Sequence, residues 1–562
     1  MLKSVAKMGI ERIKRKHGDK IYEQILIRQS YREPGAPRNA VKHRTIANLT
    51  GLPPQEIAAI ELAFKYKNDL AKLEALAAGK IVIKQGPSVG AVWTLMEVAR
   101  RTGLVKALGN SREGKLALWL VLARLIDQGS RLSATRLAAE HAVGPVLGLG
   151  GFDEDDLYAA MDWLDRRQPR IEQELFARRH SGRPPQLFLY DVTSSYLEGE
   201  CNAYAAYGYN RDGKRGKKQI VIGLLCDDAG EPVSVEVFPG NTQDVLTVES
   251  QVRKLASRFG AKGVTLVGDR GMLKSAQLEG LSSEGFHYLT AITKPQIESM
   301  LKSGALQLGM FDEQLCEVVV DGVRYLLRKN PARAAELAAS REDKFRCLAA
   351  RATRRNAYVA EHRRAKAETG LRELEAYAKK LRIEGWTRVR LEGRALVVEV
   401  EEAARAEAAR LDGCYALKTD VPPELADAET LHARYKDLTE VERAFRVMKT
   451  VQLEVRPVYV QTDAHTRAHV FIVMLALLLR RELERAWRDL DLTVAEGLAA
   501  LSTLCAQEVV LPTAAGYLAV PQPRPSLLAL FSALDLPPPE TLPRNTAPVA
   551  TRKKLPSRRK RA

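Results

Sequence analysis

The order of strand-like and helix-like segments between residues 187 and 293 restricts the possible fold more than any other feature of the sequence. Apolar, strand-like runs come first: LFLYDVT, KKQIVIGLLCDD and PVSVEVF. Two more such runs, GVTLVGDRG and HYLTAIT, then alternate with segments of helical period at 245–260 and 273–285. Strands followed by alternating helices and strands bury their apolar faces well in an α/β layer sandwich. We therefore predict a sheet covered by helices.

Two of these strand-like runs end on an aspartate. Asp191 follows LFLY, and Asp269 follows TLVG. The ends of strands are the places where α/β sheets hold ligands. A single aspartate at such a place is also an ordinary cap or turn residue, so neither residue indicates a site by itself.

A third acidic residue lies much later, in the helix-like segment YKDLTEVERAFRVMK. One stripe of this helix would carry residues three or four positions apart, namely Tyr435, Leu438, Glu442, Phe445 and Lys449. The two apolar members indicate that the stripe is partly buried. A glutamate and a lysine on such a face need a polar destination.

Asp191, Asp269 and Glu442 together predict a metal site. Carboxylate oxygens are the ligands that Mg²⁺ prefers, and a pair of ions can activate a water and stabilise the leaving oxygen of a phosphodiester. Lys449, two turns beyond Glu442, would hold a DNA phosphate.

These segments resemble those of a known family, the DDE transposases of the insertion-sequence-four type. Tyr435, Glu442 and Lys449 fit the family signature Y-x2-R-x3-E-x6-K, and the resemblance implies that Tyr435 and Lys449 contact DNA. The stretches LYDVTSSY, FPGNTQD and LVGDRGM resemble the segments around the family's first and second aspartates. The resemblance implies a ribonuclease-H-like catalytic domain in which Asp191, Asp269 and Glu442 form the catalytic triad and bind the metal ions.

One position departs from the signature. Leu438 stands where the family has an arginine, and Arg434 or Arg446 would replace the missing phosphate contact. Relatives in this branch pass through a DNA hairpin and hold a flipped base on an aromatic residue of an insertion. Trp386, in IEGWTRVRL, is the candidate for that role, with packing in a core as the alternative.

The activity implied by the resemblance is that of a transposase from a bacterial insertion sequence. Such an enzyme binds the terminal inverted repeats of its element as double-stranded DNA, and pairs two ends as a homodimer or higher oligomer. It cleaves a strand at each end and transfers the freed 3′-hydroxyl to target DNA. Two Mg²⁺ ions, which Mn²⁺ would replace, serve both steps because each is an in-line attack on phosphorus.

Composition and the resemblance together predict a series of regions along the chain. They are an N-terminal DNA-binding region (1–85), a helical region for DNA binding or dimerisation (86–183), the ribonuclease-H-like catalytic domain (184–294 and 411–475), an insertion of hairpins and a long basic helix (295–410), a C-terminal helical region (476–545) and a basic tail (546–562). The fold class is thus an α/β catalytic domain with a mainly helical region before it and helices after it. In the first region, RTIANLTGLPPQEIAAIELAFKYK predicts two short helices joined by a turn, which resembles a helix-turn-helix.

The charge balance indicates a polyanionic partner. Lys and Arg number 87 against 69 Asp and Glu, a net charge of +18. The last residues, TRKKLPSRRKRA, contain seven Lys or Arg. This tail would either keep the protein in solution or add nonspecific phosphate contacts.

Other features favour a cytoplasmic protein associated with the nucleoid, without a membrane partner. The six cysteines contain no CxxC pair, so neither a zinc cluster nor a disulfide framework is indicated. The N-terminal stretch lacks the apolar core of a signal peptide. The longest apolar run, 470–479, is far shorter than the roughly 20 residues of a membrane span and predicts a buried helix.

Other functions stay open at this stage. A haloacid-dehalogenase-like phosphatase also begins with a strand-end aspartate, but it needs a second aspartate where Thr193 stands. A non-catalytic DNA-binding repressor derived from a transposase would be free to lose the three carboxylates. A metal-dependent nuclease without strand transfer would keep them.

Overall fold

The computed structural model describes residues 8–17, 20–31, 42–66, 82–182, 184–199, 201–261, 263–270, 272–273, 281, 285–450, 452–456, 458–511 and 514–542. The chain divides into two compact units. The smaller unit contains Met1–Trp93, Ala139–Gly150 and Ala499–Pro548, and the larger one contains Thr94–Ala138, Gly151–Leu498 and Val549–Ala562. The predicted basic tail, 546–562, lies outside the described residues, as does most of the predicted helix at 273–285.

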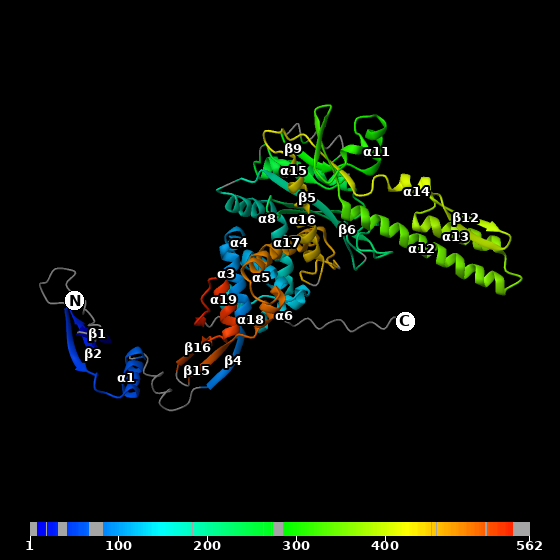
Figure 1. Cartoon of the computed structure of the whole chain (residues 1–562). Helices are drawn as coiled ribbons and strands as arrows, with labels where there is room; N and C mark the ends of the chain where they lie inside the picture. The colour runs from blue at the N-terminus through cyan, green and yellow to red at the C-terminus, as the bar shows by residue number, and fades with distance from the viewer. Residues whose placement is uncertain are drawn as a thin grey trace. The chain divides into compact units, whose positions relative to one another are not determined.

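A mixed sheet forms the centre of the larger unit. Among the described residues it has eight strands in the order β10-β11-β14-β9-β8-β5-β6-β7. Strands β5, β6 and β9 of this sheet are labelled in Figure 1. The strands predicted between 187 and 293 are all present: β5 Leu187–Tyr196, β6 Gln219–Cys226, β7 Pro232–Pro239, β8 Thr265–Gly268 and β9 His287–Ala291. The first three pair antiparallel, whereas β8 is parallel to both β5 and β9. The prediction of a sheet with helices is therefore confirmed.

Alternation along β5 separates a core from a polar face. Phe188, Tyr190 and Val192 pack into a buried cluster with side chains of helix α9, such as Val248 and Val252. This helix runs from Asp244 to Arg253 and continues as the π-helical turn Lys254–Arg258. Because neighbouring side chains of a strand point to opposite faces, Asp191 and Thr193 face away from this cluster.

Helices from distant parts of the sequence accompany the sheet. Helices α8, α5 and α17 pack against one another, and α17 also contacts β7. The apolar run at 470–479 lies in α17 and is buried, as predicted. No helix among the described residues has the length and apolar character needed to cross a membrane. The helices of residues 90–179 are α3 Gly90–Arg101, α4 Leu104–Leu108, α5 Arg112–Ile126, α6 Arg131–Glu140, α7 Val143–Leu147 and α8 Glu154–Arg179, and α17 is Asp463–Ala486.

The predicted insertion contributes strands to the main sheet. Its first hairpin turns at Asp321 and Gly322, both with positive φ, as the Asp-Gly pair predicted. Its strand β11 pairs with β14, and β14 pairs with β9, so part of residues 295–410 belongs to the sheet. The elements up to this point are α11 Lys294–Lys302, the 3₁₀ turn Leu308–Met310, β10 Cys316–Val320, β11 Val323–Lys329 and β14 Cys414–Thr419.

Residues 330–413 form an arm between β11 and β14. The arm consists of α12 Pro331–Glu361, α13 Ala367–Leu381, β12 Thr387–Glu392, β13 Ala395–Val400 and α14 Glu402–Ala409. The second predicted hairpin, β12 with β13, is confirmed. The arm has a buried core of its own, which includes Leu348, Leu374 and Trp386. The arm leaves the main sheet after Lys329 and re-enters it at Cys414, and these two residues are paired in the β11–β14 register.

The N-terminal segment contains a three-stranded sheet, whose third strand stands where the first of the two short helices was predicted. Strands β1 Met8–His17, β2 Lys20–Tyr31 and β3 Lys42–Asn48 pair antiparallel, and α1 Pro54–Tyr66 follows. The helix-turn-helix prediction is wrong for this reason: KHRTIAN is the strand β3, with Ala47 opposite Ile27. Thr45 and Ile46 are β-branched and favour a strand once a partner strand is available. The N-terminal part of the chain is therefore mainly helical only from residue 90 onwards.

Strands also replace part of the predicted C-terminal helical region. Within the predicted helical region 476–545, helix α18 ends at Ser502, and Cys505 begins a strand whose Val509 and Val510 pair with β4. The neighbouring strands follow the order β17-β16-β15-β4. The elements are β4 Val82–Ser88, α18 Val494–Ser502, β15 Cys505–Leu511, β16 Ala514–Ala519, α19 Pro525–Ala533 and β17 Thr541–Leu542.

Candidate active site

The parallel pairing of β5 and β8 brings the two predicted aspartates together. Tyr190 is paired with Gly268, so Asp191 and Asp269 are the next residues along two adjacent strands. Adjacent strands lie about 4.8 Å apart. Strand β8 ends at Gly268, as predicted, but β5 continues to Tyr196 along β6, so Asp191 lies within its strand and not at its end.

Helix α16, Leu438–Lys449, carries the third acid and contacts β5. Its apolar side chains, such as Val441 and Phe445, are buried, and Glu442 is exposed. Burial raises the pKa of Asp191 to about 7, and the carboxylates of Asp269 and Glu442 add to this rise. The structure therefore brings Asp269 and Glu442 each within electrostatic range of Asp191.

The three acids do not form a closed metal site. Among the described residues, no three His, Cys, Asp or Glu side chains are close enough together to hold a metal ion. Their donor atoms are all carboxylate oxygens, which are the atoms that a hard divalent cation binds. The positive charge that most affects Asp191 is that of Arg211, which lowers its pKa but does not offset burial and the other carboxylates.

Tyr435 lies inside the site. It belongs to α15, Ala428–Lys436, and its hydroxyl lies within electrostatic range of Asp269. Burial and the nearby carboxylate of Asp269 raise the pKa of the Tyr435 hydroxyl, so this hydroxyl stays protonated. Helix α15 thus places a neutral hydroxyl beside Asp269.

Lys449 is held by side chains that the sequence analysis missed. Its ammonium group lies 2.6 Å from the carboxylate of Asp212 and donates to the hydroxyl of Thr193 at 3.0 Å. Asp212 is 1% exposed, pairs also with Arg456 at 2.5 Å, and accepts from the backbone N–H of Tyr196 at 3.1 Å. Burial lowers the pKa of Lys449, and Asp212 opposes that shift. The hydroxyl of Thr193, two residues after Asp191, thus has a role in holding this lysine.

The remaining predicted DNA-binding residues, Arg446, Arg434 and Trp386, differ in how far they are exposed to solvent. Arg446 is exposed on α16, and Arg434 is half-buried on α15. Leu438 is 8% exposed, so the residue that departs from the family signature lies in the interior. Trp386 is 5% exposed in the core of the arm, with Arg405 over its ring. The structure thus shows the packing role that the sequence allowed for Trp386, and not a surface on which a base would stack.

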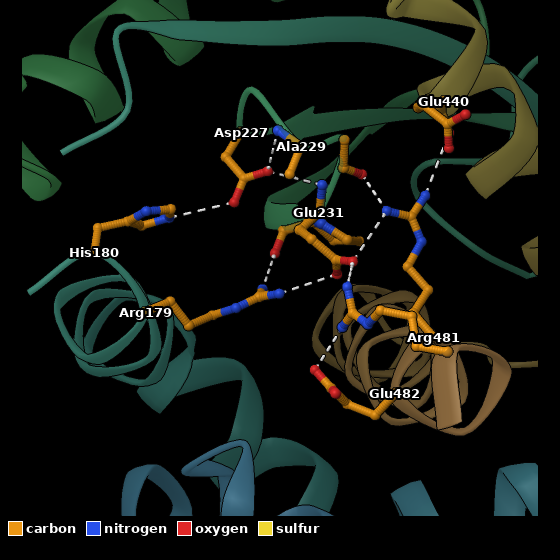
Figure 2. Close-up of polar contacts among 11 residues, drawn as sticks. Arg179, His180, Asp227, Ala229, Glu231, Glu440, Arg481 and Glu482 are labelled. Carbon is orange, nitrogen blue, oxygen red and sulfur yellow. Dashed lines mark hydrogen bonds and ion pairs between the residues drawn. The ribbon is translucent and has the colours of Figure 1, made fainter. Parts of the chain in front are cut away.

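A second polar cluster, also missed from the sequence, surrounds Glu231 in the turn between β6 and β7 (Figure 2). Arg179 of α8 lies 3.0 Å from the carboxylate of Glu231, and Arg485 of α17 lies 2.6 Å from it. Arg481 donates to the carbonyl of Gly230 and, at 3.4 Å, to that of Glu440 on α16. These contacts tie the β6–β7 turn to α8, α17 and the helix that carries Glu442.

Comparison with known proteins identifies the class of protein to which this fold and site belong. A family model described as Transposase DDE domain matches residues 182–479, more than half of the chain, and the chain belongs to that family. A second model, described as IS1634 family transposase, N-terminal domain, matches residues 10–75. The insertion-sequence-four branch predicted from the sequence is therefore not confirmed, because the N-terminal match names a different family.

Similarity to individual proteins is remote. No curated protein matches the chain. A piggyBac transposase synaptic complex with hairpin DNA is 9% identical with a TM-score of 0.34, over 73% of this chain and 75% of that one. A Mos1 transposase paired-end complex with the left transposon end is 11% identical with a TM-score of 0.15, over 32% of this chain and 58% of that one. These two likenesses are too weak to support an argument about this chain.

Proposed function

We propose that this chain is the transposase of a bacterial insertion sequence, with Asp191, Asp269 and Glu442 as its catalytic triad in a ribonuclease-H-like domain. The observation that carries the proposal is the β5–β8 register, in which the two aspartates follow a paired Tyr190 and Gly268. The effect of both Asp269 and Glu442 on the pKa of Asp191 supports including the glutamate. The match to a transposase DDE family supports the reaction class.

The proposed cofactor is a pair of Mg²⁺ ions, for which Mn²⁺ would substitute. Asp191, Asp269 and Glu442 would hold the ions, which supply an activated water or hydroxyl and stabilise the leaving oxygen of the phosphodiester. The fit rests on donor chemistry, since the carboxylates of Asp269 and Glu442 are each within electrostatic range of Asp191, which is partly buried. Two metal ions require more than one carboxylate, because one carboxylate cannot bridge the ions and also fix the second.

Other residues in this proposal bind and orient the DNA. Tyr435, whose hydroxyl lies near Asp269, is a proposed DNA contact beside one metal ligand. Arg446 and Arg434 are the proposed phosphate contacts in place of the missing signature arginine. Lys449 is the third proposed phosphate contact, held beside β5 by Thr193 and Asp212 until the DNA arrives.

The proposed partners are double-stranded DNA ends with terminal inverted repeats and a target duplex. A homodimer or higher oligomer would pair the two ends. The net charge of +18 supports a polyanionic partner. The proposed location is the bacterial cytoplasm, associated with the nucleoid.

The proposal is tested by incubating the purified protein with Mg²⁺ and DNA that carries the inverted repeats flanking its gene. We expect nicking and joining at the repeat ends. Asp191→Asn, Asp269→Asn and Glu442→Gln should each reduce cleavage at least about a hundredfold while binding persists. Glu440→Gln is the matched control, since this glutamate lies on the same helix and only its backbone carbonyl contacts Arg481 in the Glu231 cluster.

The same assay separates the alternatives. Binding without cleavage by the wild-type protein would indicate a repressor, and cleavage without joining would indicate a nuclease. If any one of the three triad variants cleaved at the wild-type rate, the assignment of that residue would be wrong.

A further inference from the structure

The loop between β5 and β6 presents aromatic rings to solvent. Within residues 201–218, which we call the tyrosine loop, Tyr207 is 67% exposed and Tyr209 is 82% exposed. Tyrosine usually buries most of its ring, so two such rings in one loop of a large globular protein are unusual. The rings are available for a partner.

The backbone of this loop is well anchored although its tyrosines are exposed. The side-chain amide of Gln219 donates to the carbonyl of Tyr209 at 3.1 Å and to that of Gly240 at 2.8 Å. Near the start of the loop, the Asn202 amide donates to the carbonyl of Val460 at 3.0 Å and to the hydroxyl of Thr466. The loop therefore holds both rings on the surface in a fixed backbone frame, which reduces the entropy lost when a ligand binds.

The same segment carries a strong positive charge. Residues 211–218 contain five basic side chains, Arg211, Lys214, Arg215, Lys217 and Lys218, and one acid, Asp212. That acid is buried against Lys449 and Arg456. Arg211 pairs with Asp244 and Lys217 with Glu198, so the positive charge that the loop offers a ligand comes mainly from Lys214, Arg215 and Lys218. The exposed part of the loop thus combines cations with aromatic rings, the combination that binds the phosphates and base faces of a nucleic acid strand.

The loop also lies beside the proposed catalytic residues. The backbone N–H of Arg211 donates at 3.0 Å to the hydroxyl of Ser194 on β5. The next residue, Asp212, pairs with Lys449, which donates to Thr193 on the same face of β5 as Asp191. Asp212 accepts from the N–H of Tyr196 at the end of the same strand. A ligand on the tyrosine loop would therefore be close to a phosphodiester bound at Asp191.

We propose that the tyrosine loop binds unpaired bases of the DNA end next to the cleaved phosphodiester, with Tyr207 and Tyr209 stacking on the bases and the basic side chains contacting the phosphates. Unpaired bases fit better than an intact duplex, because a base exposes its flat face only when its strand is unpaired or frayed. Basic side chains alone would serve an intact duplex and would give no use to two exposed rings. This inference rests on the proposed function and extends it to a new set of residues.

The test compares two DNA ends bound by the full-length protein without divalent metal. One end carries the inverted repeat as a complete duplex, and the other carries it with a short unpaired terminus. For Tyr207→Ala/Tyr209→Ala we expect binding to the unpaired end to weaken about tenfold or more, and binding to the complete duplex to change less than about threefold, in fluorescence anisotropy. A 2-aminopurine in the unpaired terminus should be quenched by the wild-type protein and not by this variant.

Two further variants make the test specific. Tyr207→Phe/Tyr209→Phe keeps the rings and should bind like the wild type. Tyr517→Ala removes a partly exposed tyrosine of β16 in the smaller unit and should bind both ends like the wild type. The two variants of the tyrosine loop should unfold at the wild-type temperature, since the rings of Tyr207 and Tyr209 are exposed.

The outcomes distinguish this inference from the proposed function. If the wild-type protein binds neither repeat end, the proposed function fails and the inference fails with it. If the wild type binds both ends and the double alanine variant binds the unpaired end equally well, the inference alone is overturned.

Discussion

At the scale of single residues, Asp191 combines burial with two neighbouring acids. Its pKa of about 7 means that the folded protein keeps a proton on this side chain at pH values where the unfolded chain, with the usual value of 3.8, has lost it. Stability from this group is complete below about pH 4 and is lost as the pH rises to about 7. At neutral pH the ionised carboxylate therefore destabilises the metal-free protein.

Asp191→Asn should consequently stabilise the metal-free protein at pH 8, by on the order of 2 kcal/mol after allowance for solvent screening. Urea denaturation in the presence of a chelator measures the difference, which should shrink towards pH 4. Addition of Mg²⁺ should raise the unfolding temperature of the wild type more than that of the variant. A variant that is less stable than the wild type at pH 8 would contradict this account.

At the scale of elements, α16 shows that restoring a residue of the family signature can conflict with the packing of the helix. Leu438 is buried at the beginning of the helix together with Val441 and Phe445. Leu438→Arg would restore the arginine of the signature, but it would bury a charge that lacks a partner.

We expect Leu438→Arg to lower the free energy of unfolding by about 3 kcal/mol, and to leave DNA cleavage no faster. Leu438→Met keeps the volume and should cost less than about 1.5 kcal/mol. Both values come from urea denaturation. Equal stability of the two variants would show that the helix begins differently from the described arrangement.

Local sequence patterns predicted some of the secondary-structure elements and missed others. The strands from β5 to β9 and the turn at Asp321 and Gly322 were predictable, because alternation, β-branched residues and Asp-Gly turns are local signals. Strand β3 was predicted as helix, because pairing with β2 decides its conformation and that partner is not visible in a local window. Strand β15 was missed for the same reason, since its partner β4 lies at the other end of the sequence.

The candidate site was also predictable only in part. A strand end indicated Asp269 and helix spacing indicated Glu442, whereas Asp191, predicted at a strand end, lies within β5. The pairing of Asp212 with Arg456 does not, because 244 positions separate the two residues and nothing in the sequence near either one indicates the other.

At the scale of the whole molecule, the Glu231 cluster joins helices that are far apart in sequence (Figure 2). Glu231 is buried, and its carboxylate receives Arg179 from α8 and Arg485 from α17. Removal of one partner from a buried ion pair leaves the other charge without compensation.

Glu231→Gln should therefore destabilise the protein by about 3 kcal/mol and lower its unfolding temperature in a thermal scan. Glu482 pairs with the same Arg485 on the exposed surface of α17, so Glu482→Gln is the matched control and should cost less than about 1 kcal/mol. Similar losses for the two variants would mean that burial does not determine the contribution of this cluster.

The two ends of the arm lie next to each other at the end of the β11–β14 pair, and this affects how the arm can vary among related proteins. Lys329 pairs with Cys414, and the N–H of Asn330 donates to the carbonyl of Gly413 at 2.8 Å. Residues 330–413 thus enter and leave at two adjacent positions of an antiparallel ladder, where a tight hairpin turn would also fit. We therefore expect that the arm can be lengthened, exchanged for another segment or removed while strands β11 and β14 stay paired.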